Sequence, residues 1–188
     1  MEVNLTGIND KELTDVFTWM EKQFDPREIK PLSRIRTFIQ SGNYDARIIN
    51  ENGAMKGYVL TAYANPSRGR LIDYLAILPD YQDQGYGSAL LRALQRDAKA
   101  SPVFLEVENP DAMRTEEEKK TALRRIAFYE KNGCRMTSIR LELFDVDFCI
   151  MVVNPDCTLD DMEIRARLDE VYHMFFPPAI YQKKVLFR

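Results

Sequence analysis

A short and almost continuously apolar segment, Leu71–Leu78, is followed by a loop with two glycines and then by a helical pattern. Its length and the lack of alternation indicate a strand that is buried on both faces. In the loop, Gly85 and Gly87 permit positive φ and a close approach of the backbone to a ligand. The helix is expected over residues 88–100, with apolar positions at Leu90, Leu91, Leu94 and Ala98. This unit predicts a sheet covered by helices.

The rest of the chain continues the alternation of helices and strands. Asn52-Gly53 joins two strand patterns and is typical of a β-hairpin. Thr115-Glu116-Glu117-Glu118 matches a capping box, and Gly133 suits the end of the same helix. The expected helices are one capped by Asp10 and running to Phe24, then 31–42, 88–100, 115–132 and 160–175, the last one ended by Pro177-Pro178. The expected strands are 44–50, 56–64, 71–78, 103–108, 135–144 and 146–153. Their order predicts a mixed α+β fold.

Composition and charge exclude several classes of protein. With 188 residues and a net charge of −3, the chain has the size of one domain and no basic face for nucleic acid or an anionic membrane. No signal peptide is apparent, and the apolar run Phe148–Val153 is too short to cross a bilayer. Three cysteines without C-x-x-C spacing indicate reduced thiols in a cytoplasmic protein. The single His173 lacks neighbours at metal-ligand spacing, so we expect no metal site.

The glycine loop suits phosphate binding through the backbone. The first amides of the following helix, from about Tyr86 to Ala89, lack intrahelical partners, and such a terminus attracts anions. Two common phosphate motifs do not fit: Leu90 replaces the third glycine of a dinucleotide fingerprint, and a Gly-Lys-Ser/Thr sequence is absent. The alternative is a strand-to-helix turn in which the glycines serve geometry alone.

Two segments resemble the GNAT superfamily of N-acetyltransferases. The family signature Gln/Arg-x-x-Gly-x-Gly/Ala is met by Gln82, Gly85 and Gly87, and the segment Phe128–Cys134 is similar to the helix end that bears the catalytic tyrosine of the family. The resemblance implies a mixed, mostly antiparallel sheet that is splayed at its centre, with helices on both faces. It implies a GNAT-like domain over residues 1–153. Residues 154–188 would form a C-terminal helical extension, packed on the same domain or at the subunit interface of a homodimer.

The resemblance also implies a binding site for acetyl-CoA. Backbone groups of Leu75, Ala76 and Ile77 would pair with the pantetheine arm of the cofactor. The loop and the first turn of the helix would hold its pyrophosphate, through Gln82, Asp83, Gln84, Gly85, Tyr86, Gly87 and Ser88.

The chemistry of acetyl transfer requires an acid and a base. By resemblance, Tyr129 is the candidate acid for the departing thiolate, and its alternative is a core tyrosine. Glu106 is the candidate base for the amine, although it and Glu108 could also line a solvated strand face. Asp73 is a charge within an apolar strand. It either has a structural hydrogen-bond partner or, like Glu108, contacts a cationic substrate.

These expectations combine into one function with one rival. No Cys–His or Ser–His pairing is evident, which favours direct attack by the amine over a covalent enzyme intermediate. We therefore expect an acetyl-CoA-dependent N-acetyltransferase whose acceptor is a primary amine of a small molecule or a peptide. The rival is a non-catalytic acyl-CoA-binding module with the same fold.

Overall fold

The computed structural model describes residues 1–97 and 101–188 and divides into two units. The first unit comprises Met1–Ala62 and Ile72–Ala93, and the second comprises Tyr63–Leu71 and Leu94–Arg188. One strand and one helix contribute residues to both units.

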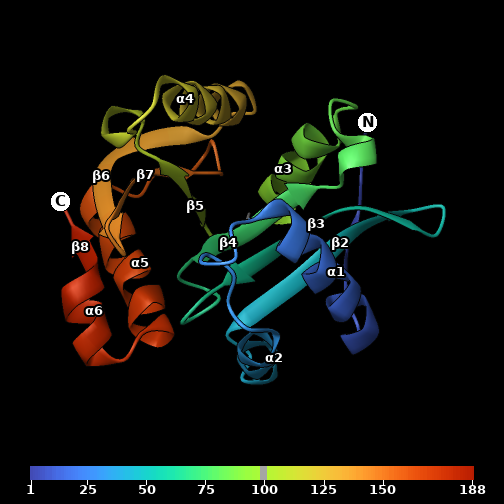
Figure 1. Cartoon of the computed structure of the whole chain (residues 1–188), viewed down its shortest axis with the longest axis horizontal. Coiled ribbons are helices and arrows are strands. Elements are labelled where there is room, and N and C mark those ends of the chain that lie inside the picture. The colour runs from blue at the N-terminus through green and yellow to red at the C-terminus, as the bar shows by residue number, and fades with distance from the viewer. Residues whose placement is uncertain (98–100) are drawn as a thin grey trace. The chain divides into compact units, whose positions relative to one another are not determined.

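The first unit holds four neighbouring strands, in the order β1-β2-β3-β4, and the N-terminal helices (Figure 1). Antiparallel pairing joins β1 to β2 and β2 to β3. The turn between β2 and β3 is Asn52-Gly53, in which both residues have positive φ, as the hairpin signal predicts. The elements are β1 Leu5–Gly7, α1 Asp10–Gln23, α2 Leu32–Gln40, β2 Tyr44–Glu51, β3 Ala54–Ala62, β4 Arg70–Ile77, a short 3₁₀ turn Pro79–Tyr81, and α3 Tyr86–Asp97.

The N-cap of the first helix lies one residue before the predicted one. Asn9, not Asp10, is the N-cap, because its side chain accepts a hydrogen bond from the Glu12 N–H while the Glu12 carboxylate accepts one from the Asn9 N–H. Asp10 lies in the first turn of α1, where a negative charge is favoured.

The second unit holds four antiparallel strands, in the order β5-β7-β6-β8. In Figure 1, α4 lies on one side of β6 and β7, while α5 and α6 lie on the other. Capping boxes at Thr115 and Asp160 start α4 and α5. The elements are β5 Val103–Glu108, a 3₁₀ turn Pro110–Ala112, α4 Glu116–Lys131, β6 Arg135–Leu143, β7 Val146–Val152, α5 Asp161–Phe175, α6 Pro178–Lys184 and β8 Val185–Phe187.

The mixed α+β class and the mostly antiparallel pairing are confirmed, but three short elements escaped prediction. They are β1, α6 and β8. Pro177-Pro178 does follow the end of α5, yet Pro178 is also the first residue of α6, since a proline fits the first turn of a helix. The predicted helix 88–100 begins earlier, at Tyr86, and its last residues, 98–100, lie outside the described part of the chain.

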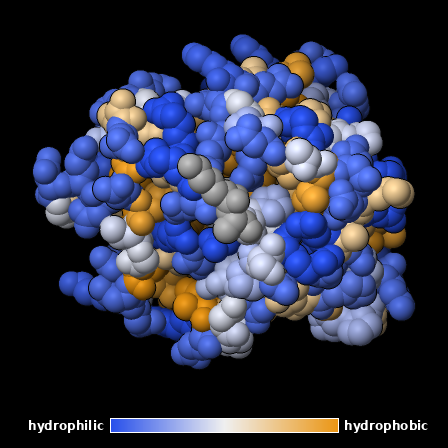
Figure 2. All heavy atoms as spheres, turned by 180° about the vertical axis from the view of Figure 1, so that it is seen from behind, coloured by the Kyte–Doolittle hydropathy of each residue, from blue (hydrophilic) through white to orange (hydrophobic). Residues whose placement is uncertain are grey.

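Polar side chains cover most of the molecular face drawn in Figure 2, where hydrophobic residues form small separate groups. Among residues 1–97 and 101–188, no helix combines the length and the apolar character needed to cross a membrane.

Candidate functional site

In the glycine loop of the first unit, Gly85 adopts positive φ, whereas Gly87 lies in the first turn of α3 and does not. Gly85 has a φ of 87°, and a Cβ built on it would meet no atom within 4 Å. Asp83 also adopts positive φ, at 58°, and its side chain is exposed. The left-handed conformation at two positions turns the chain sharply into α3, and a ligand has open space beside Gly85.

The start of α3 presents unpaired amides. The first amide of the helix with a backbone acceptor is that of Ala89, which donates to the Gly85 carbonyl at 3.0 Å. Within the described part of the chain, no acceptor is found for the N–H groups of residues 83–88. Because these donors and the positive end of the helix dipole coincide at an exposed loop, the geometry suits an anion such as a pyrophosphate.

Two glutamines use their side chains to hold the loop. The amide of Gln84 donates to the Asp80 carbonyl at 2.7 Å, and the amide of Gln82 donates to the Ile77 carbonyl at 3.1 Å. The loop conformation is therefore fixed by side chains while its backbone N–H groups stay available.

The first turn of α3 is anchored by Tyr86, which is buried. Its hydroxyl donates to the Glu51 carboxylate at 2.5 Å, and this hydrogen bond raises the pKa of the Tyr86 phenol. The ring meets Tyr81 edge-on at 5.9 Å, and the Lys56 ammonium lies 3.8 Å from the centre of the Tyr81 ring. Neither Glu51 nor Lys56 was predicted, because both come from the hairpin rather than from the loop.

The segment Leu75–Ile77 of β4 is held against both α1 and β3. The Ile77 carbonyl accepts hydrogen bonds from the side chains of Gln82 and of Gln23, the latter at 2.9 Å. On β3, a Cβ at Gly57 would lie 2.7 Å from the Ala76 carbonyl oxygen, so only glycine permits this approach. The backbone expected to receive the pantetheine arm is thus rigidly placed.

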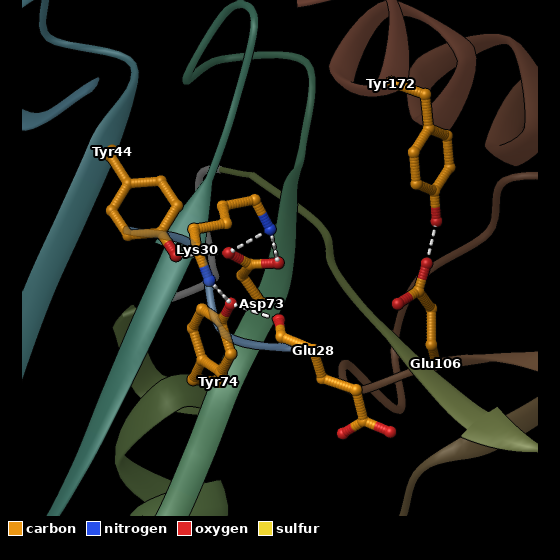
Figure 3. A network of polar contacts seen from close by, with 7 residues as sticks. All are labelled: Glu28, Lys30, Tyr44, Asp73, Tyr74, Glu106 and Tyr172. Atoms are coloured by element: carbon orange, nitrogen blue, oxygen red, sulfur yellow. Dashed lines mark hydrogen bonds and ion pairs between the residues drawn. The ribbon is translucent and has the colours of Figure 1, made fainter. Parts of the chain in front are cut away.

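Asp73 lies in a network of polar side chains within the first unit. Both oxygens of its carboxylate accept hydrogen bonds from the Lys30 ammonium, at 2.8 and 2.9 Å, and Oδ2 accepts a further one from the Tyr44 hydroxyl. Figure 3 shows these side chains converging on the carboxylate. Burial, together with the charge of Asp73, raises the pKa of Tyr44. Asp73 therefore has a counter-ion from within the protein.

The same network fixes the connection between α1 and α2. The Tyr74 hydroxyl accepts a hydrogen bond from the Lys30 N–H at 2.9 Å and donates one to the Glu28 carbonyl at 2.8 Å. Phe24 packs edge-on against the Tyr74 ring at 5.3 Å. Two adjacent residues of β4 thereby hold this connection: Asp73 binds the side chain of Lys30, and Tyr74 binds the backbone.

Replacing Asp73 by asparagine should destabilise the fold. The side chains of Lys30 and Asp73 are only 17% and 11% exposed, and the substitution removes the charge that pairs with the buried Lys30 ammonium. We expect the free energy of unfolding to fall by about 3 kcal/mol in a urea titration. The matched control is Asp10→Asn, whose ion pair with Arg36 is largely exposed and should contribute about 1 kcal/mol or less. Equal losses in the two variants would contradict the prediction.

The second unit holds the candidate base, Glu106, in the middle of β5. The hydroxyl of Tyr172, from α5, donates a hydrogen bond to the Oε1 atom of Glu106, and Figure 3 shows the two side chains pointing at each other. Glu108 lies two residues further along and accepts a hydrogen bond from the Arg125 guanidinium of α4 at 2.5 Å. Glu106 thus accepts a hydrogen bond from a neutral hydroxyl, and Glu108 accepts one from a cation.

Tyr129 lies in the last turn of α4. Its ring packs edge-on against Phe128 at 5.5 Å, and its carbonyl accepts hydrogen bonds from the N–H groups of Asn132 and Cys134. Burial, the largest cause, raises the pKa of the Tyr129 phenol. In the described residues its hydroxyl makes no hydrogen bond to protein. The raised pKa keeps the phenol protonated at neutral pH, so that it has a proton to donate.

The described residues hold no group of three or more His, Cys, Asp or Glu side chains suited to a metal ion. The free cysteines, Cys134, Cys149 and Cys157, include two that are buried, and burial raises the pKa of the Cys134 thiol to about 12. A thiol in that state is a poor nucleophile.

The comparisons with known proteins point to one family. Residues 43–133 match the family described as "Acetyltransferase (GNAT) domain". No curated protein matches the chain in sequence.

Solved structures of GNAT proteins share the fold. A GNAT-family protein from Bacteroides thetaiotaomicron is 22% identical, with a TM-score of 0.73 over 92% of this chain and 97% of that one. Spermidine N-acetyltransferase from Vibrio cholerae, solved with CoA and spermine, is 15% identical, with a TM-score of 0.58 over 80% and 94%. The ribosomal-protein-S18-alanine N-acetyltransferase of Escherichia coli is 20% identical, with a TM-score of 0.55 over 84% and 97%.

Proposed function

Since the chain carries an acetyltransferase domain of the GNAT superfamily, we propose that the protein transfers the acetyl group of acetyl-CoA to a primary amine. The observation that carries this proposal is the exposed loop before α3, where the amides of residues 83–88 have no acceptor among the described residues. They would hold the cofactor's pyrophosphate, with Asp83 contributing its N–H while its side chain stays in solvent. Leu75, Ala76 and Ile77 would bind the pantetheine arm through their backbone.

In this proposal the cofactor supplies an activated acetyl thioester, and two side chains of the protein transfer protons, one as a base and one as an acid. Glu106 accepts a proton from the acceptor's ammonium group, directly or through water, so that the neutral amine can form a bond to the carbonyl carbon. Tyr129 would donate its proton to the sulfur as the carbon–sulfur bond breaks, and the tyrosinate would then regain a proton from the nitrogen as the attached amine becomes an amide. The raised pKa of Tyr129 supports its part as an acid, because the phenol stays protonated at neutral pH.

The acceptor is proposed only as a class, a primary amine of a small molecule or a peptide. Glu106 is the foremost acidic group for this amine. Asp73 and Glu108 are less suited to bind the amine, because their carboxylates already form ion pairs with Lys30 and Arg125. The names of the structural neighbours supply two probes, spermidine and a peptide that begins with alanine.

The same proposal includes a division of the chain into a catalytic domain and a C-terminal extension. We assign residues 1–153 to the acetyltransferase domain and residues 154–188 to a C-terminal extension, which packs on that domain or joins two subunits of a homodimer. The similarity to the Bacteroides protein covers 92% of the chain, more than residues 1–153 alone would provide, which supports an extension that the two proteins share. A cytoplasmic location is supported by the three free cysteines.

Acetyl-CoA and CoA should raise the thermal unfolding temperature of the protein. A ligand that binds only the native state at about 100 times its Kd contributes roughly 2.7 kcal/mol. For a chain of this size the shift amounts to roughly 5–10 °C, measured by differential scanning fluorimetry. Gly85→Val should abolish the shift, because its side chain would enter the open space beside the loop.

The matched control for this variant is Gly53→Val. Gly53 has a φ of 77°, close to the 87° of Gly85, so valine introduces similar backbone strain in a hairpin outside the loop. The control should keep the full shift. The absence of any shift in the unmodified protein would overturn the proposal. A shift without release of CoA in the presence of any amine would instead identify an acyl-CoA-binding module.

A further inference from the structure

The C-terminal extension provides the partner of the candidate base. Tyr172 lies on α5 and is only 1% exposed, while Glu106 lies on β5 and is half-buried. The tyrosine hydroxyl donates to Oε1 of the glutamate, and both residues belong to the second unit. This hydrogen bond connects residues 66 positions apart, on the two sides of the boundary that we place after residue 153.

Tyr172 is held firmly from several directions. Its ring packs edge-on against Phe187 of β8 at 5.8 Å, and Val171 and Phe175 beside it on α5 are buried. The helix itself is fixed to β6, because Asp161 in its first turn accepts hydrogen bonds from the N–H and the hydroxyl of Ser138. The hydroxyl of Tyr172 therefore has a fixed direction.

The backbone of Glu106 is fixed by its place in β5. Glu106 is the cross-strand partner of Ile150 in the antiparallel ladder of β5 and β7. The next residues on the same face of β7, Phe148 and Val152, are also apolar. These strand neighbours are apolar, whereas the Tyr172 hydroxyl of α5 donates a hydrogen bond to the carboxylate.

We propose that Tyr172 is a positioning residue, which holds the Glu106 carboxylate in the orientation and the ionised state that proton abstraction requires. The inference rests on the proposed function, in which Glu106 is the base. It makes the C-terminal extension a part of the active site rather than an appendage.

The physical reason is that a hydroxyl donor stabilises a carboxylate more than a carboxylic acid. The Tyr172 hydrogen bond lowers the pKa of Glu106 relative to a protein without it, and so keeps the base ionised at a lower pH. It also restricts a side chain that would otherwise sample several rotamers.

Other ionisable groups near Glu106 must be considered in any pH dependence. On the same strand, Glu108 is accompanied by Arg125 of α4. On α5, the neighbours of Tyr172 are Asp169, which accepts a hydrogen bond from Tyr181, and the exposed His173. From β7, Cys149 opposes Val107, and burial raises the pKa of its thiol. All of them remain in place when the Tyr172 hydroxyl is removed.

The test is a titration of Glu106 in the full-length protein by carbon-13 NMR of labelled glutamate, with Glu106→Gln to assign the signal. In Tyr172→Phe, which keeps the ring that packs against Phe187, the midpoint should rise by roughly half to one pH unit. The matched control is Tyr181→Phe, which removes the hydroxyl that donates to Asp169, another tyrosine–carboxylate bond of the C-terminal extension. It should leave the midpoint of Glu106 unchanged.

Kinetics provide the second readout, with spermidine or an alanine-initiated peptide as the acceptor. In Tyr172→Phe, the acidic limb of kcat/KM should move to higher pH by the same amount, with the KM for acetyl-CoA unchanged. An unshifted titration would overturn the inference. The absence of CoA release by the unmodified protein would instead overturn the proposed function, because the NMR titration requires no turnover.

Discussion

Replacing Tyr129 by phenylalanine should lower kcat by about 10–10³-fold with little change in the affinity for acetyl-CoA. The variant loses the proton donor for the departing thiolate, an interaction realised only in the transition state. Because burial disfavours the phenolate and raises the pKa of Tyr129 above its ordinary value near 10, the phenol holds its proton at neutral and mildly alkaline pH. Ionisation of Tyr129 should therefore not limit the rate in that range.

The measurement is the release of free thiol at saturating acetyl-CoA, alongside the thermal shift that reports cofactor binding. Tyr181→Phe serves as the control for the loss of a tyrosine hydroxyl, since Tyr181 binds Asp169 within the C-terminal extension. It should retain its kcat. If Tyr129→Phe also retains its kcat, with the chemical step shown to be rate-limiting, Tyr129 is a packing residue of α4.

Local signals predicted most of the fold. The strand Val103–Glu108 was predicted with its observed bounds, because the apolar residues Val103, Leu105 and Val107 alternate along it with the side chains of the other face. The capping box at Thr115 gave the start of α4, since both of its hydrogen bonds join residues three positions apart. By contrast, β1 and β8 contain three residues each, and their pairing with β2 and β6 depends on tertiary contacts that no local pattern carries.

The same distinction between local signals and distant contacts applies to the candidate site. The loop was predictable because its glycines and its helix start are adjacent in the sequence. The partners of the site residues were not, because Gln23, Lys30 and Tyr172 lie 54, 43 and 66 positions from Ile77, Asp73 and Glu106. One signal was available for Tyr172: it adjoins the apolar stripe of α5, and a buried tyrosine hydroxyl usually has a hydrogen-bond partner.

Replacing Glu106 by glutamine should lower kcat/KM by about 10²-fold near neutral pH, where the acceptor is an ammonium ion. Glutamine keeps the size of the side chain and can still accept a hydrogen bond from Tyr172, but it cannot take up a proton. In the unmodified protein kcat/KM should climb with pH, as the base and then the amine lose their protons. The deficit of the variant should shrink as the pH approaches the pKa of the amine, near 10, because the neutral amine then needs no base.

The pH profile of kcat/KM between pH 6 and 10 checks this prediction, with the same acceptor for each variant. The matched control is Glu142→Gln, a half-buried strand glutamate of the second unit that is ion-paired with Arg188. It should have the profile of the unmodified protein. A deficit in Glu106→Gln that is the same at every pH would argue for a lost contact with the acceptor rather than a lost base. Activity that is indifferent to Glu106→Gln, with a neutral or acidic acceptor preferred, would show that the glutamate is a structural partner of Tyr172 without contact to the acceptor, and would leave only the cofactor site of the proposal.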